Sequence, residues 1–137
     1  MNSMTDMKEF EALRALSARI GADPALVQAA GGNTSLKDGD TLWIKASGTW
    51  LMNALREEIM VPVSLAPLLR AVAEADPVAE KAEAFAITAL NPRGLRPSIE
   101  TTVHALMPQR IVVHVHCVET IALAVQLDAG ALIAERL

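Results

Sequence analysis

The chain has 137 residues, of which 52% are hydrophobic and 20% charged, and its formal net charge is −4. This composition fits one globular domain and excludes an intrinsically disordered chain. Aromatic residues make up only 3% of the sequence and the basic residues form no block, so no nucleic-acid partner is expected. The single cysteine excludes an intrachain disulfide, and no signal peptide or membrane-spanning run is present, so we expect a cytoplasmic protein without a membrane partner.

The first half of the chain predicts helices followed by short strands. Asp23-Pro24 is typical of a helix start, and Asp38-Gly39-Asp40 is typical of a hairpin turn. Apolar spacing around these signals predicts helices at 7–20 and 24–30, strands at 34–37, 41–46 and 59–63, and a helical turn at 50–55.

The second half begins new helices at residues that suit helix N-termini. Ser64, Asp76-Pro77 and Ser98 are such starts. The pattern predicts helices at 65–75, 77–90, 99–107, 120–126 and 128–137, and a strand at 110–117. Because strands alternate with helices, the fold class is α/β, or α+β with a mixed sheet.

The predicted strand at 110–117 carries two histidines, His114 and His116, in an otherwise apolar run. Side chains two positions apart on a strand point to the same face, so the two imidazoles are expected side by side. Neutral imidazole is a preferred zinc ligand, and a metal ion offsets the cost of burying two polar rings. The alternative is a pair of core histidines that bond to the backbone or to water.

A third ligand has to come from another element, and Glu100 is the best carboxylate candidate. It lies in the first turn of the helix that precedes the histidine strand, where negative charge is favourable. Its alternative role is simply to stabilise the helix dipole. His104 is four residues further along the same helix face, and we expect it to orient Glu100 or to pack, with an extra ligand as the alternative.

Two turns rich in small residues suggest an anion site. Gly31-Gly32-Asn33-Thr34-Ser35 follows a predicted helix and precedes a strand, which is the wrong order for a dinucleotide-binding turn. Its glycines permit backbone N–H groups to approach an anion. Ala46-Ser47-Gly48 is a second such turn, and Ser98 adds a hydroxyl. Each of these is, by itself, also explained as an ordinary tight turn or helix cap.

Together these segments resemble the class II aldolase/adducin family, and within it the rhamnulose-phosphate-aldolase-like branch. The resemblance covers most of the chain and rests on four motifs in this order: 32–35, 45–48, 96–100 and 114–116. It implies a mixed, largely antiparallel sheet flanked by helices. It also implies a Zn²⁺ cofactor, with another divalent metal as an alternative, and assembly as a homo-oligomer, a tetramer in the family.

The resemblance also implies a role for each matching residue. His114 and His116 match two zinc ligands, and Glu100 matches the catalytic acid/base, which can also touch the metal. The positions that match the binding site for the substrate phosphate are Gly32, Asn33, Ser47, Gly48 and Ser98. The reaction implied is retro-aldol cleavage of a ketose 1-phosphate to dihydroxyacetone phosphate and an aldehyde.

The sequence departs from the family pattern in its histidines. It contains three, at positions 104, 114 and 116, whereas the family's third zinc histidine lies well beyond the histidine strand. We therefore expect residues 1–137 to form a single, incomplete domain of this family, its N-terminal part. The alternatives are a truncated or non-catalytic binding or assembly module and, ranked last, a metal-dependent hydrolase that uses His-x-His.

Overall fold

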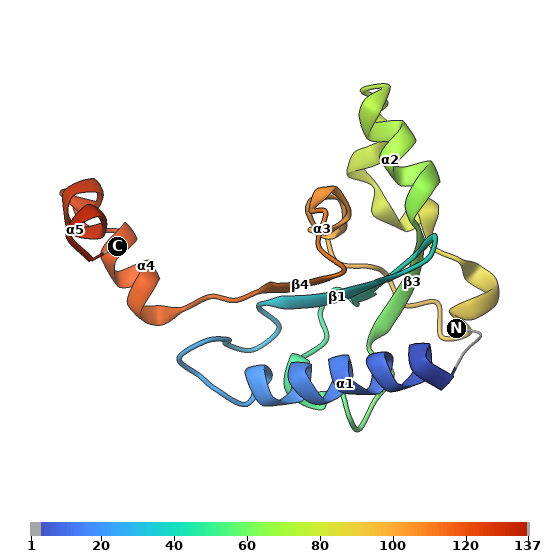
Figure 1. The fold of residues 1–137 in the computed structure, drawn as a ribbon, viewed down its shortest axis with the longest axis horizontal. Coiled ribbons are helices and arrows are strands. Elements are labelled where there is room, and N and C mark those ends of the chain that lie inside the picture. The colour runs from blue at the N-terminus through green and yellow to red at the C-terminus, as the bar shows by residue number, and fades with distance from the viewer. Residues whose placement is uncertain (1–3, 137) are drawn as a thin grey trace.

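The computed structural model describes residues 4–136, which form a four-stranded sheet with helices on both faces (Figure 1). The strand order is β3-β2-β1-β4, and every neighbouring pair is antiparallel. The strands are β1 (Asn33–Asp38), β2 (Thr41–Lys45), β3 (Met60–Ser64) and β4 (Ile111–His114). The predicted α/β class with a largely antiparallel sheet is confirmed.

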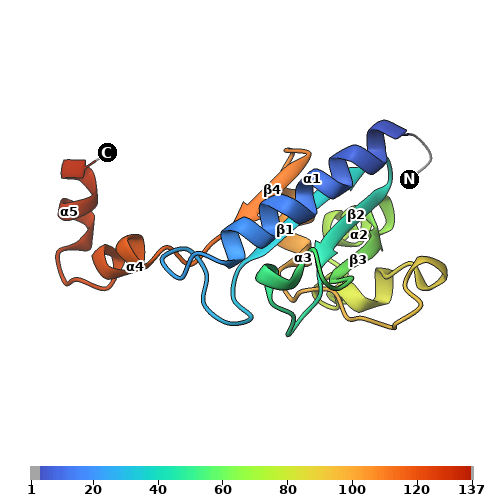
Figure 2. The ribbon, with the colours of Figure 1, turned by 90° about the horizontal axis from the view of Figure 1, so that it is seen from below.

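The helices divide between the two faces of the sheet. Helix α1 crosses one face, whereas α2 and α3 lie on the opposite face (Figures 1 and 2). No helix in residues 4–136 is long and apolar enough to cross a membrane. The α-helices are α1 (Met4–Gly21), α2 (Leu65–Ala73), α3 (Thr101–Leu106), α4 (Val118–Ala124) and α5 (Ala129–Arg136). Single-turn 3₁₀ helices occupy Leu51–Asn53, Pro77–Glu80, Ala82–Phe85 and Thr88–Leu90.

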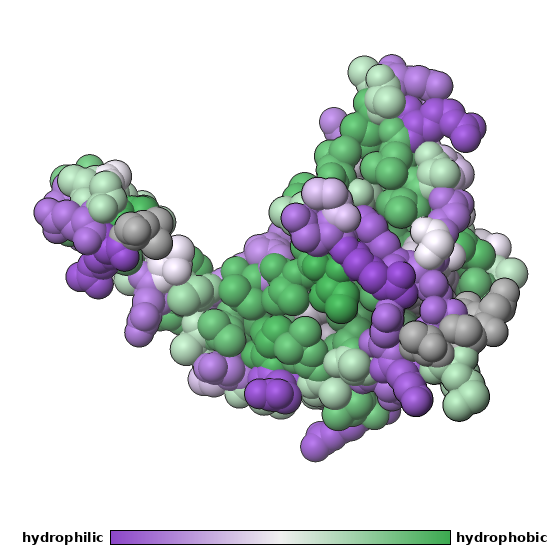
Figure 3. All heavy atoms as spheres, in the orientation of Figure 1, coloured by the Kyte–Doolittle hydropathy of each residue, from purple (hydrophilic) through white to green (hydrophobic). Residues whose placement is uncertain are grey.

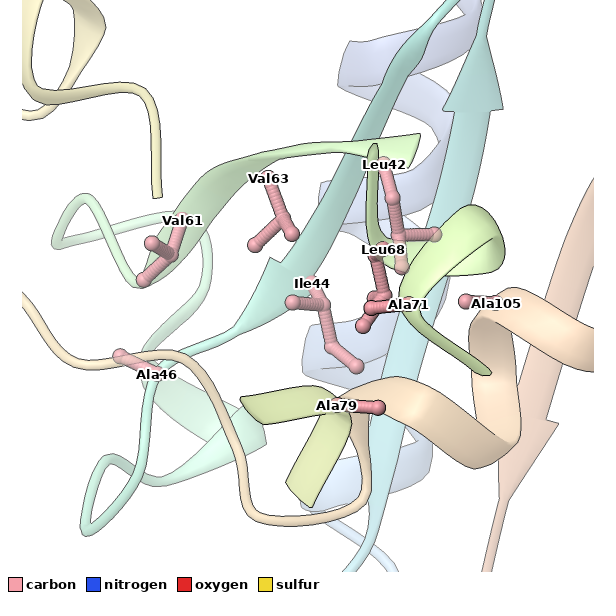
Figure 4. Packing of buried hydrophobic residues seen from close by; sticks show 9 residues of the cluster. All are labelled: Leu42, Ile44, Ala46, Val61, Val63, Leu68, Ala71, Ala79 and Ala105. Atoms are coloured by element: carbon pink, nitrogen blue, oxygen red, sulfur yellow. The ribbon is translucent and has the colours of Figure 1, made fainter. Parts of the chain in front are cut away.

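The larger core cluster fills the space between the sheet and α2 and α3 (Figure 4). Strands β2 and β3 contribute side chains at alternate positions, as expected for a sheet with one face on a core. On the α1 face, Leu13 packs in a cluster with Leu36 and Ile59, and the rings of Phe10 and Trp43 meet edge to face with their centroids 5.0 Å apart. The two cores therefore lie on opposite faces of the sheet. The larger cluster is made of Leu42, Ile44, Ala46, Val61, Val63, Leu68, Ala71, Ala79 and Ala105.

The hairpin turn predicted at Asp38-Gly39-Asp40 is confirmed, and it also caps α2. Gly39 has a φ of +55°, which glycine adopts with little strain. The Asp40 carboxylate accepts a 2.6 Å hydrogen bond from the Ala66 amide, and its carbonyl accepts one from Leu65. Ser64 precedes the helix but makes no capping bond with its side chain. The acceptors for the first amides of α2 therefore come from a residue distant in sequence.

Two predicted helices are absent because tertiary hydrogen bonds take up their backbone groups. Residues 24–30 form turns, and the Ala25 and Leu26 carbonyls accept from the amides of Val118 and His116. Residues 77–90 are broken into 3₁₀ turns, and the Ile87 amide donates to the Pro62 carbonyl on β3. The start signal at Asp76 is nevertheless correct, since its carboxylate accepts from the Val78 amide at 2.9 Å.

Helices α4 and α5 form an arm that projects from the body of the molecule (Figure 1). Neither helix contains a buried residue. Apolar side chains also gather on the outer surface at β4, where Ile111 and Val113 are exposed (Figure 3). The helices predicted at 120–126 and 128–137 correspond to α4 and α5, and Leu137 lies outside the described residues.

Candidate active site

The glycine pair Gly31-Gly32 brings the start of β1 against the end of β4. A Cβ on Gly31 would lie 2.8 Å from Nδ1 of His116, and one on Gly32 would lie 3.0 Å from the His114 carbonyl oxygen. Gly32 also has a φ of +72°, where other residues are strained. Glycine is therefore required at both positions by the close approach of β1 to the residues at and after the end of β4, and at Gly32 also by the backbone conformation. This close approach brings the two histidines near Asn33.

The residues after Asn33 anchor β1 to both neighbouring layers. The hydroxyls of Ser17 on α1 and Thr34 on β1 lie 2.6 Å apart, and both side chains are fully buried. On the other face, the Ser35 hydroxyl lies 2.7 Å from Nδ1 of His104 on α3. These buried bonds fix the strand that carries Asn33, and so fix Asn33 itself.

Glu100 lies at the N-terminus of α3, where the sequence placed it. The Ser98 hydroxyl accepts a 3.2 Å hydrogen bond from the Glu100 amide. The Glu100 carboxylate accepts from the side-chain amide of Asn33, and its Oε2 lies 2.8 Å from Nδ1 of His114. Residues from β1, β4 and the start of α3 thus converge on one carboxylate.

His104 is buried deeper than the other histidines, with only 2% of its surface exposed. Desolvation lowers its pKa to about 4, against an opposing effect of the Glu100 charge. The ring is therefore neutral at physiological pH. Since Nδ1 faces Ser35, Nε2 is the ring nitrogen that remains for another partner.

His116 lies outside the strand, which corrects the prediction of a strand over 110–117. The antiparallel pairing of β4 with β1 ends at Asn33 and His114. The residue that precedes Asn33, Gly32, has a positive φ and is no longer extended, so β1 offers no further partner. The His116 amide bonds instead to the Leu26 carbonyl at 2.7 Å. The two rings still lie close, with centroids 4.9 Å apart and planes at 64°, so they meet edge to face.

The described residues contain one group whose ligand atoms could share a metal ion: Glu100, His104 and His114, with those atoms within 4.8 Å of one another. Two imidazoles and a carboxylate form a chemically suitable set for zinc. Glu100 and His114 belong to the predicted set, whereas His104 takes the place predicted for His116. Glu100 borders a hollow of about 460 Å³ together with His104 and His114.

Glu100 also lines a second cavity, of about 200 Å³. It is also lined by His116 and Lys45. Ser98 is buried, whereas Ser47 and Gly48 are exposed at its mouth. The cavity brings together every residue predicted to bind phosphate, namely Gly32, Asn33, Ser47, Gly48 and Ser98.

Lys45 is the site residue that sequence reasoning missed. No pattern in the sequence indicates a desolvated lysine, yet Lys45 is only 2% exposed, and burial lowers the pKa of its ammonium group. Its Nζ donates to the carbonyls of Ala30 at 2.9 Å and Thr49 at 2.6 Å. The available signal was its position, as the last residue of a strand immediately before a small-residue turn.

The sequence profile described as "Class II Aldolase and Adducin N-terminal domain" matches residues 11–135. The chain belongs to the class II aldolase and adducin family. The four motifs that carried the resemblance all lie within the matched range, and in the class II aldolase-like fold they surround Glu100. A search of the curated proteins found no match.

A solved structure supports the same assignment of this class II aldolase-like chain. It is described as the N-terminal class II aldolase domain of a conserved protein from Thermoplasma acidophilum, and it superposes with a TM-score of 0.73 at 26% sequence identity. The match covers 98% of the present chain and 65% of that chain. The chain therefore spans slightly less than two thirds of the structure to which it is similar.

Proposed function

We propose that this protein is a metal-dependent aldolase that cleaves a ketose 1-phosphate to dihydroxyacetone phosphate and an aldehyde. The observation that carries the proposal is the position of Glu100, whose carboxylate contacts His114 and also lines the cavity formed by the glycine and serine turns. The proposed metal ligand, the proposed acid/base and the proposed anion pocket therefore meet at one residue. Membership of the family supports the same reaction class.

The proposed metal is Zn²⁺, held by His114, His116 and Glu100. His116 and Glu100 border the cavity, so an ion held by them is accessible to a ligand there. His104 is less suited to this position, because it is almost fully buried and already bonded to Ser35. We assign His104 to the support of the site, with Glu100 and His114 common to either ligand set.

When bound, the zinc ion would stabilise the negative charge that develops on the substrate oxygens during carbon–carbon cleavage. Glu100 would move the proton at the carbon next to the carbonyl, as a general acid/base. Hydrogen bonds from Asn33 and His114 hold the Glu100 carboxylate in a fixed orientation. A fixed carboxylate needs little reorganisation at the moment of proton transfer.

The substrate phosphate is proposed to bind among Gly32, Asn33, Ser47, Gly48 and Ser98. Both glycines have a positive φ, and the two serines contribute hydroxyl groups. Ile99, next to Ser98, is 85% exposed and offers no hydrogen bond to an anion. The phosphate contacts therefore come mainly from the two turns and from Ser98.

We further propose a cytoplasmic homo-oligomer, tetrameric as in the family. The exposed apolar residues of β4 and α4, among them Val113 and Ile121, support an assembled state, since a monomer would leave them in water. The domain organisation, with residues 1–137 as one incomplete domain, belongs to the same proposal.

The test is release of dihydroxyacetone phosphate from a panel of ketose 1-phosphates, measured with a coupled reductase assay. Zinc-loaded protein is compared with protein treated with a chelator and then reloaded. The proposal predicts cleavage of at least one substrate, its loss after chelation and its recovery with zinc. Zinc-loaded protein that cleaves none of the panel would contradict the enzymatic proposal and favour a non-catalytic binding module.

A further inference from the structure

A third cavity, of about 300 Å³, lies between α1, β2 and the segment that leads into β3. Helix α1 contributes Phe10, Glu11 and Arg14, whose spacing places them on one face of the helix. Trp43 of β2 forms another part of the wall, because side chains alternate along this strand and its neighbours enter the larger core. No residue proposed to bind metal or phosphate lines this cavity.

The indole N–H of Trp43 lacks a hydrogen-bond partner. In residues 4–136 it is the one buried side-chain nitrogen or oxygen in that condition. The edge-to-face contact with Phe10 packs the ring but supplies no oxygen or nitrogen acceptor. A buried donor without a partner has given up its hydrogen bond to water without replacement. Because the Trp43 ring lines the cavity, a molecule held there can supply the missing acceptor.

The charges around the cavity disfavour an anion. The Arg14 guanidinium donates to a carboxylate oxygen of Glu11 and to the Ala54 carbonyl, both at 2.8 Å, so its charge is already paired. Glu58 is exposed at the cavity and forms no ion pair with any described residue. One basic and two acidic side chains leave a negative excess, and the Glu58 carboxylate can accept from a ligand donor.

The rest of the lining is apolar and consists of Met7, Ile59, Met60 and Leu90. Aromatic rings and methionine side chains pack favourably against a flat ring. Small-molecule sites typically measure about 300–1,000 Å³, so this cavity has the size for one ring with a short substituent.

We propose that this cavity is a second ligand site, which binds a neutral aromatic carboxamide. The carbonyl oxygen of the ligand accepts from the Trp43 indole, its amide group donates to Glu58, and its ring packs beside Phe10. A cation would offer the indole no acceptor, and an anion would meet the excess of negative charge. The site uses no residue of the proposed aldolase reaction, so either proposal can fail without the other.

The experiment compares benzamide, benzoate and benzamidinium, which have the same shape and are neutral, negative and positive. Dissociation constants are measured near neutral pH by NMR titration, from the backbone amides of Ile59 and Met60. Benzamide is expected to bind at least about threefold more tightly than either ion. Equal or tighter binding of benzoate or benzamidinium would overturn the inference, as would no binding of benzamide up to its solubility limit.

Replacement of Trp43 by phenylalanine removes the N–H and keeps an aromatic ring. Trp43→Phe is expected to weaken benzamide binding by about threefold to tenfold, and to change benzamidinium binding by less than about twofold. Trp50→Phe is the matched control, because Trp50 is exposed and lies outside the lining, and it should change neither. Equal weakening of both probes by Trp43→Phe would indicate a loss of packing alone and overturn the assigned hydrogen bond.

A second measurement uses the unaltered chain and so does not depend on the folding of a variant. The chain contains two tryptophans, so two indole N–H resonances are expected, and the spectra of the two variants assign them. The Trp43 indole proton should move downfield when benzamide is added, because it gains an acceptor, while that of Trp50 stays in place. A Trp43 resonance that does not move at saturating benzamide would overturn the inference.

Discussion

The carboxylate of Glu100 and the imidazole of His114 are in direct contact, with Oε2 and Nδ1 2.8 Å apart. A carboxylate only accepts hydrogen bonds, so this contact requires a hydrogen on Nδ1 and leaves Nε2 as the ring nitrogen that can bind a metal ion. A carboxylate in this position fixes the tautomer and orientation of a metal-binding histidine. The proposed acid/base and the proposed metal ligand are therefore coupled, and a change in one affects the other.

Replacement of Glu100 by glutamine tests the acid/base role. Glu100→Gln retains the size of the side chain and removes its basicity, so kcat should fall on the order of a hundredfold to ten-thousandfold in the zinc-loaded protein. Steady-state assays of dihydroxyacetone phosphate release measure this. Glu83→Gln, at an exposed position, serves as the control and should leave kcat unchanged. Comparable loss in both variants would argue against a specific role for Glu100.

The lowered pKa of His104 predicts that the free energy of unfolding falls in mild acid. Its pKa is about 4 in the folded chain against an ordinary value of 6.5, so the unfolded chain binds the proton first as the pH falls. Stability is therefore lost between pH 6.5 and about 4, by about 3 kcal/mol in full. Urea unfolding of metal-free protein across this range, compared with His104→Gln, isolates the contribution. A variant with the same pH slope as the wild type would contradict it.

Gly32 should be far less tolerant of alanine than Gly39. Both have a positive φ, at +72° and +55°, which costs an alanine about 1–2 kcal/mol. A Cβ on Gly39 meets open space, whereas one on Gly32 comes within 3.0 Å of the His114 carbonyl and of Val27. Gly32→Ala should lower the free energy of unfolding by about 1–3 kcal/mol more than Gly39→Ala. Equal costs in chemical unfolding would mean that the β1–β4 approach is looser than described.

The arm of α4 and α5 should exchange its amide hydrogens much faster than the sheet. No residue of either helix is buried, while β1 and β2 lie in the middle of the sheet between two cores. Amides with little packing over them open with a small free energy. Hydrogen exchange followed by mass spectrometry at low protein concentration measures the difference. Equal protection of arm and sheet under those conditions would show that the arm is packed.

The sequence predicted elements best where the signal and its partner are local. The hairpin at Asp38-Gly39-Asp40, the helix at 7–20 and the cap at Asp76 all depend on residues a few positions apart. The predictions of helices at 24–30 and 77–90 were wrong because residues distant in the sequence, His116 and Pro62, form hydrogen bonds with the backbone of these segments. Such bonds leave no periodic pattern in the sequence.

The same distinction applies to the candidate site. The turns and Glu100 were predictable because each motif carries its own chemistry, and the cavity brings them together. The burial of Lys45 was not, since it depends on how the turns at Ala30 and Thr49 fold over it. The compact metal group contains His104 and not His116. Strand β4 ends at His114, before His116, and the apolar run through residue 117 had predicted a longer strand.

The most direct test of the central proposal is the zinc content per chain, by elemental analysis, of the wild type and of three histidine variants. The wild type, supplied with zinc and then dialysed, should hold close to one ion per chain. His114→Ala and His116→Ala should hold almost none, whereas His104→Gln should retain the ion. A wild-type chain without zinc, or loss of the ion in His104→Gln with retention in His116→Ala, would contradict the proposed metal site.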